Sequence, residues 1–273
     1  MINKKNILDI KPTELEQIIK ELGFPSYRAA QIYNSIFKNL TFDPSSISSL
    51  PIRLRTQIKE IFNWAMPKIQ KFLQSNDQTY KFLFKAYDNN YWESVLMIYH
   101  NRITLCVSSQ IGCRLSCKFC QTGTLGFVRN LLCSEILAQY FESNKYYHNH
   151  ILPYINDEIT HTHTTHRMPK HISNIVFMGM GEPLNNYENI LQSIYFLISE
   201  KYLNLSYKHV TISTAGIVPA IYKLADEKIH PTWAISLNTA DEELRNQLMP
   251  INKHYPLSEL KKSLIYFQQK TKQ

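Results

Sequence analysis

The spacing of hydrophobic residues predicts that the chain begins with helices. Three runs of apolar positions recur at intervals of three and four residues, as in helices with one buried face. They are Leu15, Ile18, Ile19 and Leu22, then Ala29, Ile32, Tyr33 and Ile36, then Leu54, Ile58, Ile61 and Phe62. We therefore expect a small basic helical domain over residues 1–66.

From residue 79 onward the pattern has a period of two, as in β-strands. Residues 79–87 and 91–99 alternate apolar and polar side chains on either side of an Asp88-Asn89-Asn90 turn, and residues 103–109 follow as a third strand. These strands predict a short β meander, with a β-hairpin connection over residues 67–102.

Beyond the meander, short apolar runs alternate with helical stretches. We predict strands at residues 172–178, 209–213 and 232–238, and helices near residues 187–200, 217–227 and 241–248 and from about residue 257. Such alternation indicates βαβ units, in which loops after the strand ends carry the functional residues. Residues 103–273 are thus expected to form an α/β domain with a parallel sheet or barrel.

One segment, residues 146–171, shows no apolar period and contains six of the ten histidines. Three of these stand in His161-Thr162-His163-Thr164-Thr165-His166. Low-complexity inserts between a helix and a strand are usually surface loops, so we predict a flexible loop. A metal-binding segment is the alternative.

The composition is that of a globular protein and favours a polyanionic partner. Of 273 residues, 44% are hydrophobic and 19% are charged, which excludes a disordered chain, a collagen-like fibre and a coiled coil. The sequence contains no apolar stretch long enough for a membrane span and no signal-peptide core, so a cytoplasmic protein without membrane attachment is expected. The net charge of +8 suits an anionic partner such as a nucleic acid, with a basic solvated surface as the alternative.

All five cysteines lie between positions 106 and 133, a clustering that suggests metal chemistry. Cys113, Cys117 and Cys120 follow a Cys-x-x-x-Cys-x-x-Cys pattern. Three thiolates can hold three irons of an iron-sulfur cluster and leave one iron open to an external ligand. The alternatives are a zinc site with three cysteines and one histidine, or three buried cysteines on one helical face. Glycines and polar residues around the pattern favour the cluster, because they indicate a loop.

The cysteine pattern and several further segments resemble one family. The segments are residues 105–113, 126–131, 176–184, 211–219 and 248–252. Together they are similar to the RlmN/Cfr family of radical S-adenosylmethionine (SAM) RNA adenine methyltransferases. The resemblance implies a 4Fe-4S cluster held by Cys113, Cys117 and Cys120, with SAM chelated by the fourth iron. It also implies a partial (β/α) barrel, of which this chain would contain about four of the family's six units.

The same resemblance assigns the remaining site residues. The implied cofactor-binding positions are Gly181, Glu182, Ser213, Ser236, Leu237 and Asn238. Glu93 matches the carboxylate that removes the proton from adenine C2, and Cys106 matches the resolving cysteine whose disulfide frees the product. Without the resemblance, Glu93 would be interpreted as a solvent-facing strand carboxylate and Cys106 as a buried strand thiol.

The resemblance also implies partners. The substrate would be C2 of adenosine in 23S rRNA and tRNA, the electron donor would be of the flavodoxin or ferredoxin type, and a monomer is expected. The family's carrier cysteine, which takes up the methyl group, lies on a C-terminal tail. No residue of this chain matches it, so the chain is expected to be C-terminally truncated and inactive in methyl transfer by itself. The alternatives are a radical SAM enzyme without an RNA substrate and a non-catalytic RNA-binding remnant that holds zinc.

Overall fold

The computed structural model describes residues 4–99, 101–153 and 169–272. Of the predicted loop over residues 146–171, residues 154–168 with His161, His163 and His166 lie outside the described residues. Its predicted start is wrong, because Tyr147–Ile151 form a π-helical turn in which Tyr147 and Ile151 are buried.

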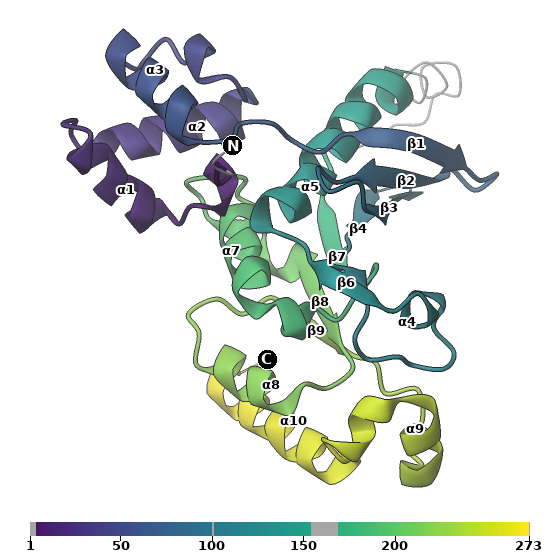
Figure 1. The fold of residues 1–273 in the computed structure, drawn as a ribbon. Helices are drawn as coiled ribbons and strands as arrows, with labels where there is room; N and C mark the ends of the chain where they lie inside the picture. Colours follow the sequence, from purple (N-terminus) through teal and green to yellow (C-terminus); the bar gives the residue numbers. More distant parts are fainter. Residues whose placement is uncertain (1–3, 100, 154–168, 273) are drawn as a thin grey trace.

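Seven strands of the described part of the chain form one sheet in the order β1-β2-β3-β4-β7-β8-β9 (Figure 1). Neighbours from β1 to β4 are antiparallel, whereas β4, β7, β8 and β9 run parallel. The strands span Ile69–Gln74 (β1), Thr79–Lys85 (β2), Tyr91–Tyr99 (β3), Arg102–Cys106 (β4), Asn174–Phe177 (β7), Val210–Thr214 (β8) and Thr232–Ile235 (β9). The meander and the parallel strands are therefore continuous through the β3–β4 pair.

A helix follows each parallel strand, which confirms the predicted α/β class and a partial barrel with four strand-helix units. These helices are α5 (Cys133–Tyr146), α7 (Tyr187–Ile198), α8 (Val218–Ala225), α9 (Glu242–Leu248) and α10 (Leu257–Thr271). The N-terminal helices are α1 (Pro12–Glu21), α2 (Tyr27–Asn39) and α3 (Ile52–Ile61). Short 3-10 helices lie at Ile7–Asp9, Pro44–Ser46, Pro183–Asn186, Tyr207–His209 and Pro250–Lys253, and a π-helical turn at Tyr147–Ile151. No helix among the described residues combines the length and apolarity that crossing a bilayer requires.

Some short elements are not predicted by the sequence pattern. β1 is the edge strand, and five of its six residues are exposed, so it lacks the alternation of a half-buried strand. β5 (Gln110–Gly112) and β6 (Phe127–Asn130) form a separate antiparallel ribbon, with α4 (Gln121–Thr124) in the loop between them. These elements have only three or four residues each, too few for a period to be recognised.

The N-terminal helices share a core with the barrel helices. Phe37 of α2 stacks on Phe196 of α7, with ring centroids 4.9 Å apart, and contacts Phe141 of α5 at 5.7 Å. Tyr33 also contacts Phe196 (5.3 Å) and Tyr202 (5.7 Å). Buried aromatic contacts of this kind hold two layers together strongly. The helical domain is therefore fixed against the helix side of the sheet.

Asp9 links the N-terminal segment to the first turn of α5. Its carboxylate accepts hydrogen bonds from the backbone N–H (2.7 Å) and the hydroxyl (3.0 Å) of Ser134. Burial raises the pKa of Asp9 to about 6, although both hydrogen bonds from Ser134 lower it. The folded state thus binds this proton more tightly than the unfolded state. The resulting stabilisation is present below about pH 4 and is lost as the pH rises through 6.

Asp9→Asn is expected to reduce this pH dependence while leaving Ser134 a hydrogen-bond partner. The titration of Asp9 should lower the unfolding free energy of the wild-type chain by about 2 kcal/mol between pH 4 and pH 8. The variant lacks this carboxyl group and should not show this decrease. Urea unfolding at both pH values measures the difference and cancels titrations common to both proteins. Equal pH dependence in the two would show that Asp9 does not titrate as described.

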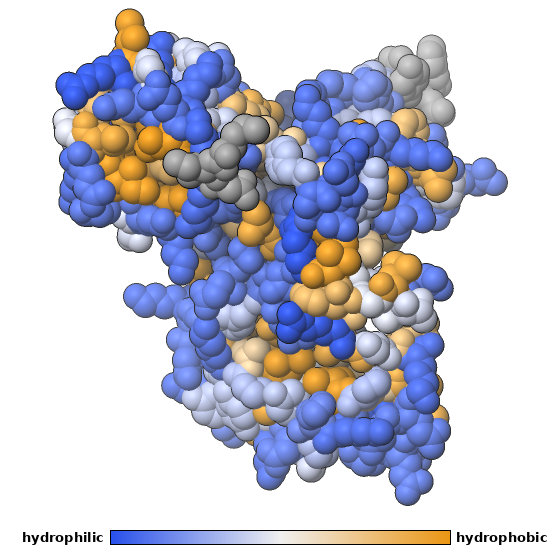
Figure 2. All heavy atoms as spheres, viewed as in Figure 1, coloured by the Kyte–Doolittle hydropathy of each residue, from blue (hydrophilic) through white to orange (hydrophobic). Residues whose placement is uncertain are grey.

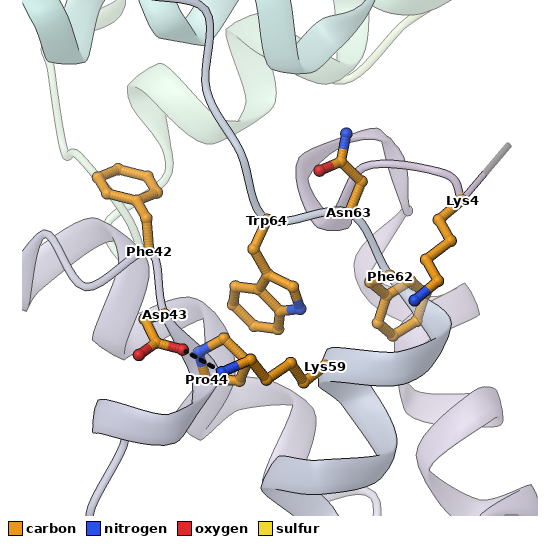
Figure 3. Close-up of a pocket in the computed structure, with 8 residues that line it drawn as sticks. All are labelled: Lys4, Phe42, Asp43, Pro44, Lys59, Phe62, Asn63 and Trp64. Carbon is orange, nitrogen blue, oxygen red and sulfur yellow. Dashed lines mark ion pairs between the residues drawn. The ribbon is translucent and has the colours of Figure 1, made fainter.

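A cavity of about 350 Å³ lies in the helical domain (Figure 3). Phe42, Phe62 and Trp64 line it together with Lys59 and Asp43, which form an ion pair at 3.6 Å. All of its lining residues belong to the first 64 positions. It therefore contains none of the residues that the sequence assigns to the active site.

Candidate active site

The predicted catalytic and cofactor residues come together on the open face of the sheet. Leu105 and Ile212, the strand neighbours of Cys106 and Ser213, are buried in the core on the helix side. Because side chains alternate along a strand, Cys106 and Ser213 project to the opposite face. The hydroxyls of Ser213 and Ser236 lie 3.1 Å apart, so the ends of β8 and β9 present adjacent polar groups.

The three cysteines lie in the loop closed by the β5–β6 ribbon, which we call the cluster loop (residues 113–126). The Cys113 N–H donates to the Gly126 carbonyl (2.9 Å), and the Lys118 N–H donates to the Leu248 carbonyl (2.9 Å). Gly112 has a φ of +74°, and a Cβ there would collide with the Gly126 carbonyl. A glycine is thus required for the ribbon to close.

The thiols of the cluster loop are free and partly exposed. Burial raises the pKa of Cys117 to about 11, with neighbouring thiols adding to the shift, and burial also raises the pKa of Cys113. Within the described residues, no three His, Cys, Asp or Glu side chains converge closely enough to share one metal ion. An iron-sulfur cluster does not require such convergence, because each thiolate binds a different iron. The positive charge of bound iron would favour the thiolates that burial disfavours, so the three residues fit the group.

Gly181 and Glu182 follow β7 and pack on the β5 strand. Gly181 has a φ of +97°, and a Cβ there would collide with the Gln110 side chain. The buried Glu182 carboxylate accepts hydrogen bonds from the N–H groups of Leu184 (3.1 Å) and Ala215 (2.8 Å). Burial raises the pKa of Glu182 despite these hydrogen bonds. This carboxylate connects the loops after β7 and β8, and its implied contact with the methionine ammonium group stays a prediction.

Gln110 is a site residue that the sequence analysis does not single out. Its Oε1 accepts the Glu182 N–H (2.9 Å), and its Nε2 donates to Oδ1 of Asn130 (2.8 Å). The buried Gln110 amide thereby fixes the ribbon that bears the cluster loop against the end of β7. Its only sequence signal is its position within the segment 105–113, which resembles the family, since its partner Glu182 lies 72 positions away.

Glu93 and Cys106 lie on neighbouring strands. Val95 of β3 is paired with Cys106 of β4, and Glu93 stands two residues further along the same face. The Glu93 carboxylate is 3.1 Å from Nζ of Lys81, and both side chains are partly exposed, at 42% and 45%. Burial raises the pKa of Cys106 to about 11, with a weaker opposing effect of the Met178 N–H. The structure thus places an accessible carboxylate diagonal to a neutral thiol.

The segment after β9 exposes Leu237. Asn238 adopts a left-handed conformation, with a φ of +61°, and its amide donates to the Ser236 carbonyl (3.2 Å). Its amide also contacts the sulfur of Met249 at 3.2 Å. Leu237 is consequently held outward at the edge of the predicted cofactor site.

Arg245 is a second residue missing from the sequence analysis. Its guanidinium is fully buried and donates to the carbonyls of Ala215 (2.8 Å) and Leu237 (3.2 Å) and to Oδ1 of Asn252. Burial lowers the pKa of Arg245, whereas Glu242 and Cys117 raise it. The buried Arg245 side chain therefore connects the loop after β8, the segment after β9 and the 3-10 helix at Pro250–Lys253, beside the cluster loop. Its position next to the segment 248–252, which resembles the family, is the only sequence signal for it.

Arg245→Met is expected to lower the unfolding free energy by about 3 to 5 kcal/mol, because two buried acceptors and one part-buried acceptor lose their donor. Arg245→Lys, which keeps the charge but not the three-way geometry, should fall between this variant and the wild type. The exposed Arg102 supplies the matched control, Arg102→Met. If R245M and R102M had the same free energy of unfolding in urea, the proposed role of Arg245 in holding the three loops would be refuted.

Apolar side chains are exposed around the cluster loop. Figure 2 shows hydrophobic surface over β6 and α4, to which Phe119, Leu125 and Val128 contribute. The outer surface of the loop is therefore not purely polar.

These features define the class of the enzyme. The family model described as the Radical SAM superfamily matches residues 107–272, which include the cluster loop and every parallel strand after β4. The chain belongs to this superfamily of enzymes, which use a 4Fe-4S cluster and SAM.

Relatives narrow the assignment further. A protein of Dictyoglomus turgidum called "Probable dual-specificity RNA methyltransferase RlmN" is 40% identical over 266 residues, which cover 97% of this chain and 71% of that protein. A protein of Clostridium botulinum (strain Eklund 17B / Type B) with the same description is 40% identical over 269 residues, covering 98% and 71%. The crystal structure of a radical SAM methyltransferase from Sphaerobacter thermophilus matches with a TM-score of 0.82 and 33% identity, covering 98% of this chain and 74% of that one. The chain is a member of the RlmN family of RNA methyltransferases, as its resemblance implies.

Proposed function

We propose that this chain acts on C2 of adenosine in 23S rRNA and tRNA. The observation that carries the proposal is the placement of Glu93 and Cys106 on adjacent strands of one open sheet face, with β7 between the strand of Cys106 and the end of β8, where Ser213 lies beside Ser236. Adenine C2 is electron-poor and cannot attack a sulfonium methyl group as a nucleophile, so methylation there requires radical chemistry. Such a route needs a base, a resolving thiol and a carrier thiol, and Glu93 and Cys106 would supply the first two.

Each residue has a distinct task in this proposal. Cys113, Cys117 and Cys120 would hold the cluster, which when bound supplies the electron that cleaves SAM to a 5′-deoxyadenosyl radical. The backbone of Gly181 and Glu182 and the rim formed by Ser213, Ser236, Leu237 and Asn238 would bind and orient SAM. Glu93 would accept the C2 proton, and Cys106 would attack the sulfur of the carrier cysteine, so that a disulfide forms between them as the bond from the carrier sulfur to the product carbon breaks.

A carrier thiol is the one group that the five cysteines do not supply. Cys133, the only unassigned cysteine, is fully buried and accepts a hydrogen bond from the Ser193 hydroxyl (3.3 Å). Burial raises the pKa of Cys133 well above its usual value. It therefore cannot reach a substrate, and methyl transfer is expected to need a further thiol.

The proposed partners follow from the same chemistry. The basic helical domain (residues 1–66) is proposed to contribute to RNA binding, and a flavodoxin- or ferredoxin-type protein to supply electrons to a monomeric enzyme. The excess of 30 Lys and Arg over 22 Asp and Glu supports a polyanionic substrate.

The test measures two products separately. Reconstituted protein is incubated anaerobically with SAM, a reductant and tRNA, and 5′-deoxyadenosine and 2-methyladenosine are quantified by mass spectrometry. The 273-residue chain is expected to form 5′-deoxyadenosine. Extended at its C-terminus by a carrier-cysteine tail of the kind that the family resemblance implies, it is expected to form 2-methyladenosine as well. Absence of 5′-deoxyadenosine would overturn the proposed cofactor site. If the extended protein formed 5′-deoxyadenosine but no 2-methyladenosine, the proposed substrate would be wrong.

A further inference from the structure

The open face of the meander combines lysines with apolar side chains. Phe82, Phe84 and Trp92 are buried on the opposite face, in the core that contains α5. Alternate residues of β1, β2 and β3 therefore point away from the helices. Their cross-strand pairs are Lys71 with Leu83, Leu83 with Glu93, Leu73 with Lys81, Lys81 with Val95, and Lys85 with Tyr91.

This face is accessible and bears a net positive charge. Leu73 is 57% exposed and Tyr91 is 45% exposed, large fractions for apolar and aromatic side chains in a sheet. The face bears three lysines (Lys71, Lys81 and Lys85) and one carboxylate, that of Glu93. A surface of this composition fits single-stranded RNA, in which phosphates bind lysines while ribose and bases contact apolar and aromatic side chains.

The face is continuous with the candidate active site. Lys81 contacts Glu93 directly (3.1 Å), and Val95 is the pairing partner of Cys106. When the target adenine is bound at Glu93, the neighbouring nucleotides must lie over the adjacent protein surface. β1 is about 10 Å from β3, two strand spacings away, and so lies within reach of those nucleotides.

We propose that the open face of β1–β3 binds the RNA strand next to the target adenosine, with Lys71 and Lys85 on phosphates and Leu73 and Tyr91 on ribose or base. The proposal rests on the proposed function, because the position of the target base at Glu93 decides which strand crosses this face. The surface is distinct from the helical domain, which lies on the helix side of the sheet.

The experiment compares two double variants of equal net charge. Lys71→Ala/Lys85→Ala removes two lysines of the face without touching Lys81 or Glu93, and Lys201→Ala/Lys261→Ala removes two exposed lysines elsewhere. Binding of a fluorescently labelled tRNA transcript is titrated across a range of salt concentrations. Loss of two phosphate contacts should reduce the slope of log K against log salt by about 1.4 to 1.8 and weaken binding roughly 30-fold at 0.1 M salt. The control variant should bind like the wild type.

The outcomes separate this proposal from the one on which it rests. If K71A/K85A kept the tRNA affinity and the salt slope of the wild type, the proposed RNA-binding surface would be wrong. The same conclusion would follow if the control variant lost as much affinity and slope. In both cases the proposed function would be unaffected. A wild-type chain that bound no tRNA would overturn both. If K71A/K85A instead lost binding to an acidic electron-transfer protein and kept RNA binding, the face would be a docking site for the reductant and the proposal would be wrong.

Discussion

A chain in which Cys113, Cys117 and Cys120 are all replaced by alanine is expected to retain no 4Fe-4S cluster. Each thiolate binds one iron of the cluster, so single substitutions should also lose most of the cluster. The cluster loop is held by backbone contacts of Cys113 with Gly126 and of Lys118 with Leu248, which do not depend on the thiols. The variant should therefore fold, and its unfolding temperature without iron should stay close to that of the iron-free wild type.

Iron and sulfide content and visible absorption after anaerobic reconstitution measure this effect. Cys106→Ala is the matched control, because it removes a thiol outside the loop and should leave the iron content unchanged. Full iron content in the triple variant would refute the assignment of these three ligands.

Glu93→Gln is expected to stop methylation without stopping cofactor cleavage. Glutamine has nearly the shape of glutamate but cannot accept the C2 proton, and the loss of a general base typically costs about a hundred- to ten-thousandfold in rate. The measurement uses the extended protein described above, with 2-methyladenosine as the product and 5′-deoxyadenosine as the internal control.

A second variant distinguishes the role of Glu93 as the base from the role of its ion pair with Lys81. Lys81→Met breaks the contact at 3.1 Å but leaves the carboxylate in place, so at saturating RNA its methylation rate should fall far less than that of Glu93→Gln. Equal losses in the two variants would mean that Glu93 acts only through Lys81, and the assignment of the base would fail.

The parallel strands could be located from the sequence because each is a short apolar run between helical stretches. The prediction of residues 172–178 contains the observed Asn174–Phe177, and that of residues 232–238 contains Thr232–Ile235. β1 could not be located, because Gln70, Lys71 and Gln74 give an exposed edge strand the composition of a loop. β9 lies at the other edge of the sheet and has no buried residue either, but its Trp233 and Ile235 still mark it as a strand, whereas β1 lacks such an alternation.

The candidate site could be predicted where the chemistry is local in sequence. The three cysteines share one short loop, and the residues at the strand ends follow apolar runs. Gln110 and Arg245 could not be found, because their roles arise from contacts with Glu182 and Ala215, which are 72 and 30 positions away. For Glu182 the sequence indicated a site residue, but only the structure shows that its carboxylate binds two backbone amides of the protein.

The aromatic contacts between α2 and the barrel helices also limit how the chain can vary. Phe37 is in ring contact with both Phe141 and Phe196, so a smaller residue at position 37 leaves a void lined by the other two. A helical domain exchanged from another protein would bring a surface shaped for different partners. Replacement of the α2 face that bears Tyr33 and Phe37 is therefore expected to require compensating changes in α5 and α7.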